Sequence, residues 1–204
     1  AAAGKGKGGI KITIGNTRQV FSADFIHLKL IQQALLYILV GNGIYLYNLP
    51  LEEILFFFCI PYASLFTYHC MKKFLSLSRF PYLGLTLVLM PALLIGGIFF
   101  APKYYTTLTF MGLALMLLLL LFYRPTWLAH FYVSFAIILL PFFIVNGILT
   151  GTWINEPVVW YNNAENMGIR LFTIPLEDVF YGMLLLLLNT WLYETLLRRS
   201  WQQV

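Results

Sequence analysis

The sequence predicts an all-α membrane protein, a polytopic bundle of transmembrane helices built on a parallel internal repeat. Of its 204 residues, 60% are hydrophobic and only 10% are charged, whereas a soluble domain carries roughly 25% charged residues. The mean hydropathy is +0.80. Two segments of the chain also align with each other without a gap. We therefore expect a multi-pass protein of a cell membrane, with helices packed in lipid.

The first 41 residues are the least regular part of the predicted bundle. Residues 1–25 begin Ala-Ala-Ala-Gly-Lys-Gly-Lys-Gly-Gly and lack the apolar core of a signal peptide, so we interpret them as a flexible basic tail or an aberrant amino end. Residues 26–41 are apolar but short, and they include His27 and Lys29. A span needs roughly 20 apolar residues, so for this segment crossing the bilayer and lying along its surface both stay open.

Five stronger apolar runs predict transmembrane helices. The predicted spans are 50–71, 81–101, 104–122, 127–149 and 175–197. Charged residues or prolines interrupt the chain between the earlier runs, and a polar loop over residues 151–174 precedes the last run. Pro61, Pro91 and Pro141 lie inside spans, where bilayer helices tolerate the kinks that proline causes.

Two of these spans open with adjacent carboxylates. Glu52 and Glu53 follow Leu-Pro-Leu, and Glu177 and Asp178 follow Ile-Pro-Leu. Charges at membrane depth are expensive and mark functional sites by default. One such motif is also an ordinary helix start, because proline at the first position and acids in the first turn favour the helix dipole. The recurrence of the pair at membrane depth favours a functional site.

The two motifs belong to a longer internal repeat. Residues 43–57 align with residues 168–182 at an offset of 125 residues. The identical pairs are Gly43/Gly168, Ile44/Ile169, Leu46/Leu171, Pro50/Pro175, Leu51/Leu176 and Glu52/Glu177. A parallel repeat relates its halves by an axis along the membrane normal. The expected complete architecture is three helices, a linker helix and three more helices.

The repeat divides the chain into four expected segments. They are the tail 1–25, a partial first repeat 26–80, a linker transmembrane helix 81–103 and a second repeat 104–204. At the same offset, the counterpart of the span 127–149 falls on the basic, glycine-rich tail. We therefore expect the first repeat to lack its first two helices, and full activity to need a restored amino-terminal extension.

The basic residues predict the orientation of the bundle. One set of loops holds Lys72, Lys73, Arg79, Arg124, Arg198 and Arg199. The opposite loops hold Lys103 and Arg170 together with Glu156 and Glu165. Since Lys and Arg collect in cytoplasmic loops, the first set is expected in the cytoplasm and both acid motifs at the non-cytoplasmic side. The net charge of +5 then indicates loop orientation, and we expect no nucleic-acid partner.

The residues around both motifs resemble the membrane-embedded lycopene β-cyclase domain. The resemblance rests on Gly-Ile-Tyr-Leu-Tyr-Asn-Leu-Pro-Leu-Glu-Glu-Ile-Leu-Phe-Phe-Phe, on the later Tyr-His-Cys, and on the stretch from Val158 to Asp178. It covers about residues 43–200, with both halves on one chain as in the fused form of the enzyme. The family implies an isomerase of carotenoid biosynthesis that closes the acyclic ends of lycopene into β-ionone rings.

Ring closure of a polyene end calls for an acid and a base. The acid protonates the terminal double bond, an internal alkene attacks the resulting cation, and the base removes a ring proton. No electrons enter or leave, so we expect no cofactor. Carboxylates with pKa values pushed apart by their environments suit this chemistry. The predicted catalytic residues are Glu52, Glu53, Glu177 and Asp178, and which of them is acid or base stays open.

Aromatic side chains near the acids are candidates for binding the substrate, because ring faces stabilise cations. Packing against lipid or other helices is the more frequent role for each single aromatic residue. Trp160, Tyr161 and Asn162 form either an aromatic belt element or a lid over the site. The predicted substrate-binding residues are Phe56, Phe57, Tyr62, Asn162 and Tyr181. No metal-ligand spacing stands out, and we predict no metal.

Transport is the alternative function, because parallel repeats and intramembrane acids occur in transporters too. A retinal protein would need a lysine deep in a span, and none of the strong spans offers one. The expected partners are lycopene or a related acyclic carotenoid and the lipid bilayer. Whether several copies of the chain assemble, and whether the product carries one ring or two, stays open.

The two acid pairs are expected to share one cavity. Burying four acids separately against lipid would cost several kcal/mol for each ionised group. Acids that meet can share protons and hydrogen bonds, which splits their titrations. We therefore expect Glu52 or Glu53 and Glu177 or Asp178 to line an apolar, aromatic-walled cavity near the outer third of the bilayer.

Overall fold

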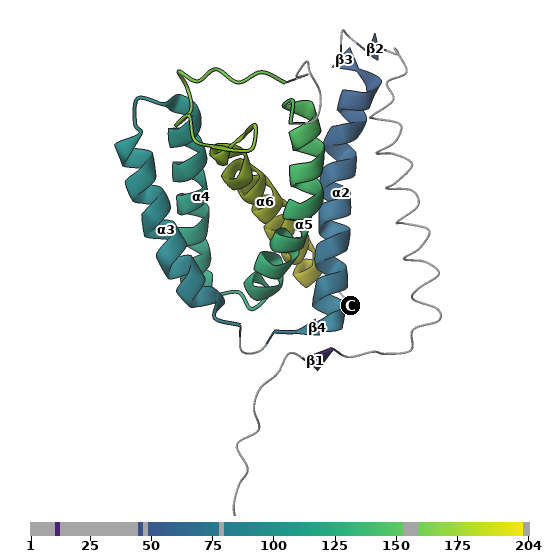
Figure 1. Ribbon diagram of the computed structural model, residues 1–204. Helices are drawn as coiled ribbons and strands as arrows, with labels where there is room; N and C mark the ends of the chain where they lie inside the picture. The colour runs from purple at the N-terminus through teal and green to yellow at the C-terminus, as the bar shows by residue number, and fades with distance from the viewer. Residues whose placement is uncertain (1–10, 13–44, 47–48, 78–79, 153–158, 202–204) are drawn as a thin grey trace, which may run out of the picture. The chain divides into compact units, whose positions relative to one another are not determined.

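The computed structural model describes residues 11–12, 45–46, 49–77, 80–152 and 159–201 (Figure 1). The predicted tail lies almost wholly outside these residues, and the segment 26–41 lies entirely outside them, so both stay predictions. The chain divides into two compact units, residues 1–78 and 79–204, which we describe one at a time.

The described residues contain five α-helices, one for each predicted span. They are α2 (Leu51–Phe74), α3 (Tyr82–Phe99), α4 (Tyr104–Tyr123), α5 (Leu128–Leu149) and α6 (Leu176–Trp201). Among the described residues, α3, α4, α5 and residues 176–198 of α6 are long and apolar enough to cross a membrane. The helical, multi-pass character predicted from composition is thereby confirmed. The helix α2 is not among these four, and its crossing of the bilayer stays a prediction.

The first unit consists of α2 and two short antiparallel strand pairs. The pairs are β1 (Lys11–Ile12) with β4 (Leu75–Ser76) and β2 (Tyr45–Leu46) with β3 (Leu49–Pro50). The pair β2–β3 leads directly into α2, because Leu51 follows β3 as the first residue of the helix. The first turn of α2 contains Glu52 and Glu53, whose side chains lie outside the described part of the structure.

A second hairpin stands at the same place before α6. The strand β5 (Arg170–Leu171) pairs with β6 (Ile174–Pro175), and α6 begins at the next residue, Leu176. Arg170 lies opposite Pro175, as Tyr45 lies opposite Pro50 in the first hairpin. Each of these positions is separated from its counterpart by the offset of the sequence repeat.

Within the second unit, α4 packs between α3 and α6, and α5 packs against α6 (Figure 1). Two glycines permit the close approaches of α4. A Cβ atom on Gly96 of α3 would come within 3.0 Å of the Phe110 ring of α4, and one on Gly112 of α4 within 3.0 Å of Leu184 on α6. Small residues at helix interfaces let backbones approach closely inside a membrane. The spacing of α4 and α6 therefore depends on a residue without a side chain.

The core of the second unit is mainly apolar, and a pair of hydroxyl groups links two of its helices. Its buried hydrophobic residues include Leu113, Leu117 and Leu120 of α4, Leu128 and Phe131 of α5, and Met183 and Leu187 of α6. The hydroxyl groups of Thr86 on α3 and Tyr132 on α5 lie 2.7 Å apart in this core. Each of these hydroxyls therefore has a partner, which a buried polar group needs in an apolar setting.

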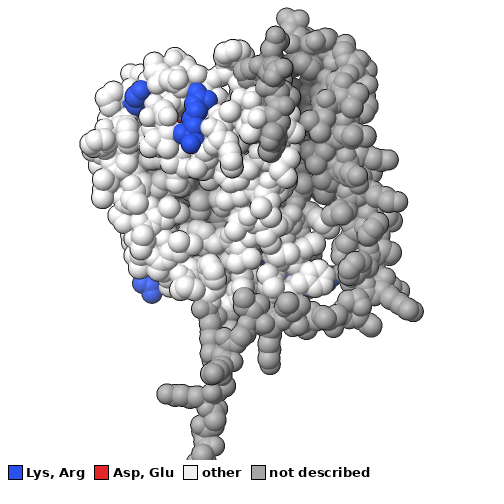
Figure 2. All heavy atoms as spheres, in the orientation of Figure 1, with Lys and Arg blue, Asp and Glu red and all other residues white. Residues whose placement is uncertain are grey.

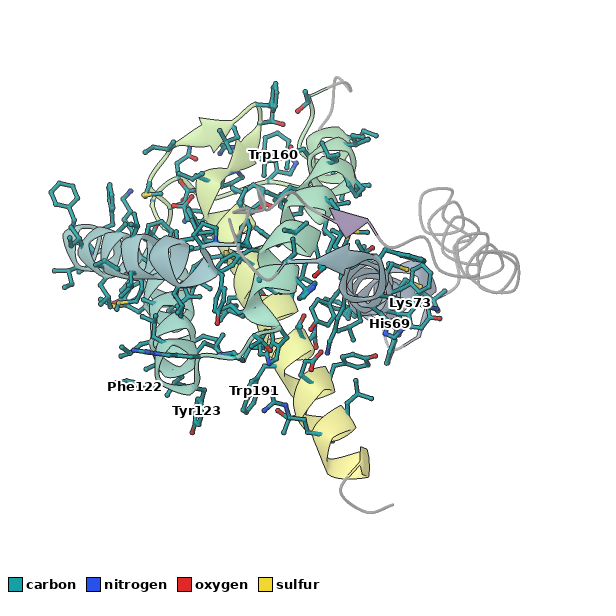
Figure 3. The ribbon with its side chains drawn as sticks, turned by 90° about the horizontal axis from the view of Figure 1, so that it is seen from below. His69, Lys73, Phe122, Tyr123, Trp160 and Trp191 are labelled. Carbon is teal, nitrogen blue, oxygen red and sulfur yellow. The ribbon has the colours of Figure 1, made fainter. Side chains whose placement is uncertain are left out.

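The surface of the second unit suits a membrane. On the face drawn in Figure 2, the blue Lys and Arg side chains lie near the two ends of the bundle, and no red Asp or Glu atom of the described residues shows. Phe122 and Tyr123, at the end of α4, are 78% and 76% exposed, and Figure 3 shows them at the outer side of the bundle. Aromatic residues in such places are typical of the membrane–water interface.

Candidate active site

The second hairpin places two carboxylates at the start of α6. The backbone N–H of Leu176 donates to the carbonyl oxygen of Ile169 at 3.0 Å, which ties the helix start to the chain before the hairpin. The next two residues are Glu177 and Asp178, which are 0% and 7% exposed. Both acids lie in the first helical turn, where the helix dipole favours negative charge.

Two tyrosines bind the carboxylate of Asp178. The hydroxyl of Tyr105, on α4, donates to Oδ1 of Asp178 at 2.6 Å. The hydroxyl of Tyr161, on the loop before the hairpin, donates to Oδ2. Each carboxylate oxygen therefore has one phenol donor, and the two donors come from different segments of the chain.

In the described part of the structure, hydrogen bonds reach one of the two oxygens of the Glu177 carboxylate. Its Oε1 accepts hydrogen bonds from the hydroxyl of Thr106 at 2.6 Å and from the backbone N–H of Met167 at 2.6 Å. Its Oε2 is buried and has no hydrogen-bond partner among the described residues. A buried polar atom without a partner is rare in proteins and costly in free energy. The environment of Glu177 thus differs from that of Asp178, although the two residues are adjacent.

The donors from α4 match the acids of α6 residue by residue. Tyr105 binds Asp178, and the next residue, Thr106, binds Glu177. Thr106 is fully buried, whereas Tyr104 on the other side of Tyr105 is 71% exposed. The packing of the two helices therefore determines which carboxylate receives which donor.

Two basic side chains, Arg170 and Lys103, hydrogen-bond to the loop that carries Tyr161. The guanidinium of Arg170 donates to Oδ1 of Asn163 at 2.7 Å and to the carbonyl oxygen of Thr173 at 2.9 Å, and it lies 6.0 Å from the ring centroid of Tyr161. Lys103 donates to the carbonyl oxygen of Asn163 at 3.0 Å. Burial, and next the hydrogen bond to Asp178, raises the pKa of the Tyr161 phenol, so its hydroxyl stays protonated at neutral pH.

The predicted substrate-binding residues have different surroundings in the structure. Tyr181 lies one turn after Asp178 and is 44% exposed, with its ring centroid 6.2 Å from that of Tyr105. Asn162 is exposed, and its Oδ1 accepts the backbone N–H of Ala164 at 3.0 Å. Phe57 and Tyr62 lie on α2 in the first unit and are exposed.

The remaining predicted site residues, Glu52, Glu53 and Phe56, have side chains outside the described part of the structure. The contribution of the first acid pair, and the shared cavity expected for both pairs, stay predictions. Among the described residues, no group of three or more His, Cys, Asp or Glu side chains could hold a metal ion.

Tyr105 and Thr106 are partners of the acids that were not predicted from the sequence. A signal for them was present, because the basic residues put Lys103 and Arg170 on the same side of the membrane. The span that starts at 104 and the span that starts at 175 therefore begin at the same surface. For Tyr161, the sequence predicts only a place in an aromatic belt element or a lid. Its hydroxyl contacts the site, whereas Trp160 beside it is 80% exposed and lies on the loop in Figure 3.

Comparison with protein families gives one match that covers most of the chain. A family model described as lycopene cyclase matches residues 37–71 and 102–196. The matched stretches include both acid pairs as well as Tyr105, Thr106 and Tyr161. Comparison with curated proteins and comparison with solved structures each give no match.

Proposed function

The chain belongs to the lycopene cyclase family, and we propose that Glu177 and Asp178 are the acid–base pair with which it closes the ends of its substrate. It is an enzyme of carotenoid biosynthesis that cyclises lycopene, as the resemblance in sequence predicted. Its substrate is an apolar carotenoid, and its apolar helices suit the lipid in which such a substrate dissolves. The proposal concerns which residues move the protons.

The unpartnered Oε2 of Glu177 is the observation that carries the proposal. Oε1 of Glu177 accepts two hydrogen bonds, and Oε2 is buried without a partner in the part of the chain that the structure describes. This arrangement fits a carboxylic acid whose proton sits on Oε2. A polyene offers no oxygen or nitrogen to bind, so the oxygen that gives it a proton is left without a partner in its absence. Glu177 is therefore the proton donor to the terminal double bond.

Asp178 fits the opposite role. Burial opposes the ionised form of this carboxylate, and two phenol hydroxyls, which donate to its two oxygens, favour it. An ionised carboxylate next to the forming ring accepts the proton that the ring cation loses. The net reaction then moves one proton onto the substrate and one off it, and no electrons are exchanged. The rings of Tyr105 and Tyr181, 6.2 Å apart, are available to stabilise the cation between these steps.

The first acid pair belongs to the same proposal through the internal repeat. The hairpins β2–β3 and β5–β6 pair equivalent residues, and each leads without a gap into a helix whose first turn carries two acids. This correspondence supports a parallel repeat in which Glu52 and Glu53 repeat the positions of Glu177 and Asp178. We propose that both pairs act from the non-cytoplasmic side.

Replacing Asp178 tests the assignment. In a host that accumulates lycopene, Asp178→Asn keeps the shape of the side chain but removes the proton acceptor. General acid–base groups contribute roughly 100- to 10,000-fold to the rate, so cyclised pigment should fall at least 100-fold. Glu165→Gln is the matched control, because the side chain of this nearby loop acid is not part of the proposed pair. Wild-type levels of cyclic carotenoid from Asp178→Asn, at equal amounts of membrane-inserted protein, would refute the assignment.

A further inference from the structure

We propose that Tyr161 is a positioning residue for Asp178 and that Arg170, at the surface, holds Tyr161 in place. The inference rests on the proposed role of Asp178 as proton acceptor. It adds a chain of contacts that runs from exposed basic residues to a buried carboxylate. These contacts fix the direction in which Asp178 presents its oxygens to the substrate.

The two phenols that bind Asp178 are held in different ways. Tyr105 is on α4, whose packing against α6 fixes its position through the helix itself. Tyr161 lies on an irregular loop, outside any helix or strand. Backbone hydrogen bonds near it include Val159 to Leu149 at 3.0 Å and Glu165 to Asn162 at 3.1 Å. A phenol on such a segment needs side-chain contacts to keep its hydroxyl on one carboxylate oxygen.

Arg170 supplies these contacts from the hairpin. Its guanidinium lies 6.0 Å from the centre of the Tyr161 ring, and it donates to Asn163 two residues further along the loop. Its other hydrogen bond, to the carbonyl oxygen of Thr173, keeps the guanidinium on the hairpin that leads into α6. Lys103 holds Asn163 from the start of α4. The loop next to Tyr161 is therefore fixed to both helices that carry site residues.

The same loop also reaches the other carboxylate, through the backbone N–H of Met167 on Oε1 of Glu177. Tyr161 and Met167 thus join one short segment to both acids. Arg170 and Asn163 are exposed, so they can be changed without opening the buried core. The geometry separates residues that bind the acids from residues that only hold the loop.

Kinetics of four variants test the proposal. The full chain is reconstituted in liposomes that contain lycopene, and kcat and KM are measured with lycopene as a mole fraction of lipid. The variants are Tyr161→Phe, Arg170→Gln, the double variant and Tyr104→Phe as the matched control. Tyr161→Phe keeps the ring and removes the donor, so kcat should fall roughly 10- to 100-fold while KM stays within about twofold. Tyr104→Phe should match the wild type, because Tyr104 is exposed and is not part of the proposed site.

The double variant tests whether Arg170 acts through Tyr161. Arg170→Gln alone should lower kcat by a smaller factor, and it should add nothing in the Tyr161→Phe background, since residues in one network are not additive. Independent, multiplying effects of the two changes would overturn the arrangement, as would wild-type kcat in Tyr161→Phe. If Tyr161→Phe does not fold, Arg170→Gln decides, since a lower kcat at unchanged KM supports the proposal and an unchanged kcat overturns it.

Asp178→Asn in the same assay separates the two proposals. An active Asp178→Asn refutes the acid–base assignment, whereas an inactive Asp178→Asn with a wild-type Tyr161→Phe refutes only the positioning role.

Discussion

Adjacent acids become chemically different when they receive different donors. Glu177 and Asp178 are neighbours in one helical turn, yet the described residues bind both oxygens of Asp178 and one oxygen of Glu177. An acid and a base at one site need environments that keep them in different protonation states. The donors, and not the acids alone, therefore make this pair suitable for moving protons on and off a polyene.

The hydroxyl of Thr106 is the side-chain donor to Oε1 of Glu177. Thr106→Val keeps the branched shape but removes the donor to Oε1. Because one hydrogen bond to a carboxyl group is lost, cyclisation should slow by about tenfold. Thr106→Ser restores the hydroxyl and should recover most of the rate. Turnover of reconstituted protein measures both. Equal rates for the valine and serine variants would show that this hydrogen bond does not support the reaction.

At the scale of elements, the contact between α4 and α6 assembles the site. Gly112 lets the two helices approach, because a Cβ atom there would come within 3.0 Å of Leu184. Of these two helices, α4 carries Tyr105 and Thr106, and α6 carries both acids. A change that separates the helices should therefore lower stability and activity together.

Gly112→Leu is the variant that makes this change. Overpacking of a tight interface typically costs about 1–3 kcal/mol, so thermal stability in detergent should fall, and cyclisation should fall with it. The control is Gly84→Leu, since nothing lies within 4 Å of a Cβ atom at Gly84 on α3. Equal melting temperatures for the two variants would contradict the proposed dependence on close packing of α4 against α6.

The helices could be predicted from the sequence, whereas the partners of the acids could not. The run predicted at 104–122 forms a helix over Tyr104–Tyr123, because length and hydropathy largely decide where a chain forms a membrane helix. The burial of Glu177 and Asp178 could also be predicted, because the two acids stand at the start of an apolar span. Tyr105 and Thr106 lie 73 and 71 residues from their acids, and the alignment of α4 with α6 depends on packing that no local pattern contains.

At the scale of the whole molecule, the distribution of basic residues predicts which side of the membrane holds the site. The loop at Lys103 and the hairpin at Arg170 belong to the end of the bundle where α6 begins, and Arg124 follows the opposite end of α4. Lys and Arg are most abundant in cytoplasmic loops. The acid–base centre should therefore lie near the non-cytoplasmic surface.

Labelling of single cysteines tests this orientation. With Cys59 and Cys70 replaced by serine, Ala101→Cys lies at the expected outer end and Thr126→Cys at the expected inner end, and both positions are exposed. A membrane-impermeant maleimide should label Ala101→Cys on intact cells and Thr126→Cys only after permeabilisation. The reverse pattern would place the carboxylates at the cytoplasmic side.

The central claim is that the carboxylates of the repeated motif perform the cyclisation. The most direct measurement is the pigment composition of lycopene-accumulating cells that express Glu177→Gln or Glu52→Gln, compared with the wild type at equal levels of membrane-inserted protein. Glutamine preserves size and the helix start but cannot give up a proton as an acid, so both variants should leave lycopene uncyclised. Wild-type amounts of cyclic carotenoid from both variants would contradict the claim, and the acid pairs would then be ordinary helix starts.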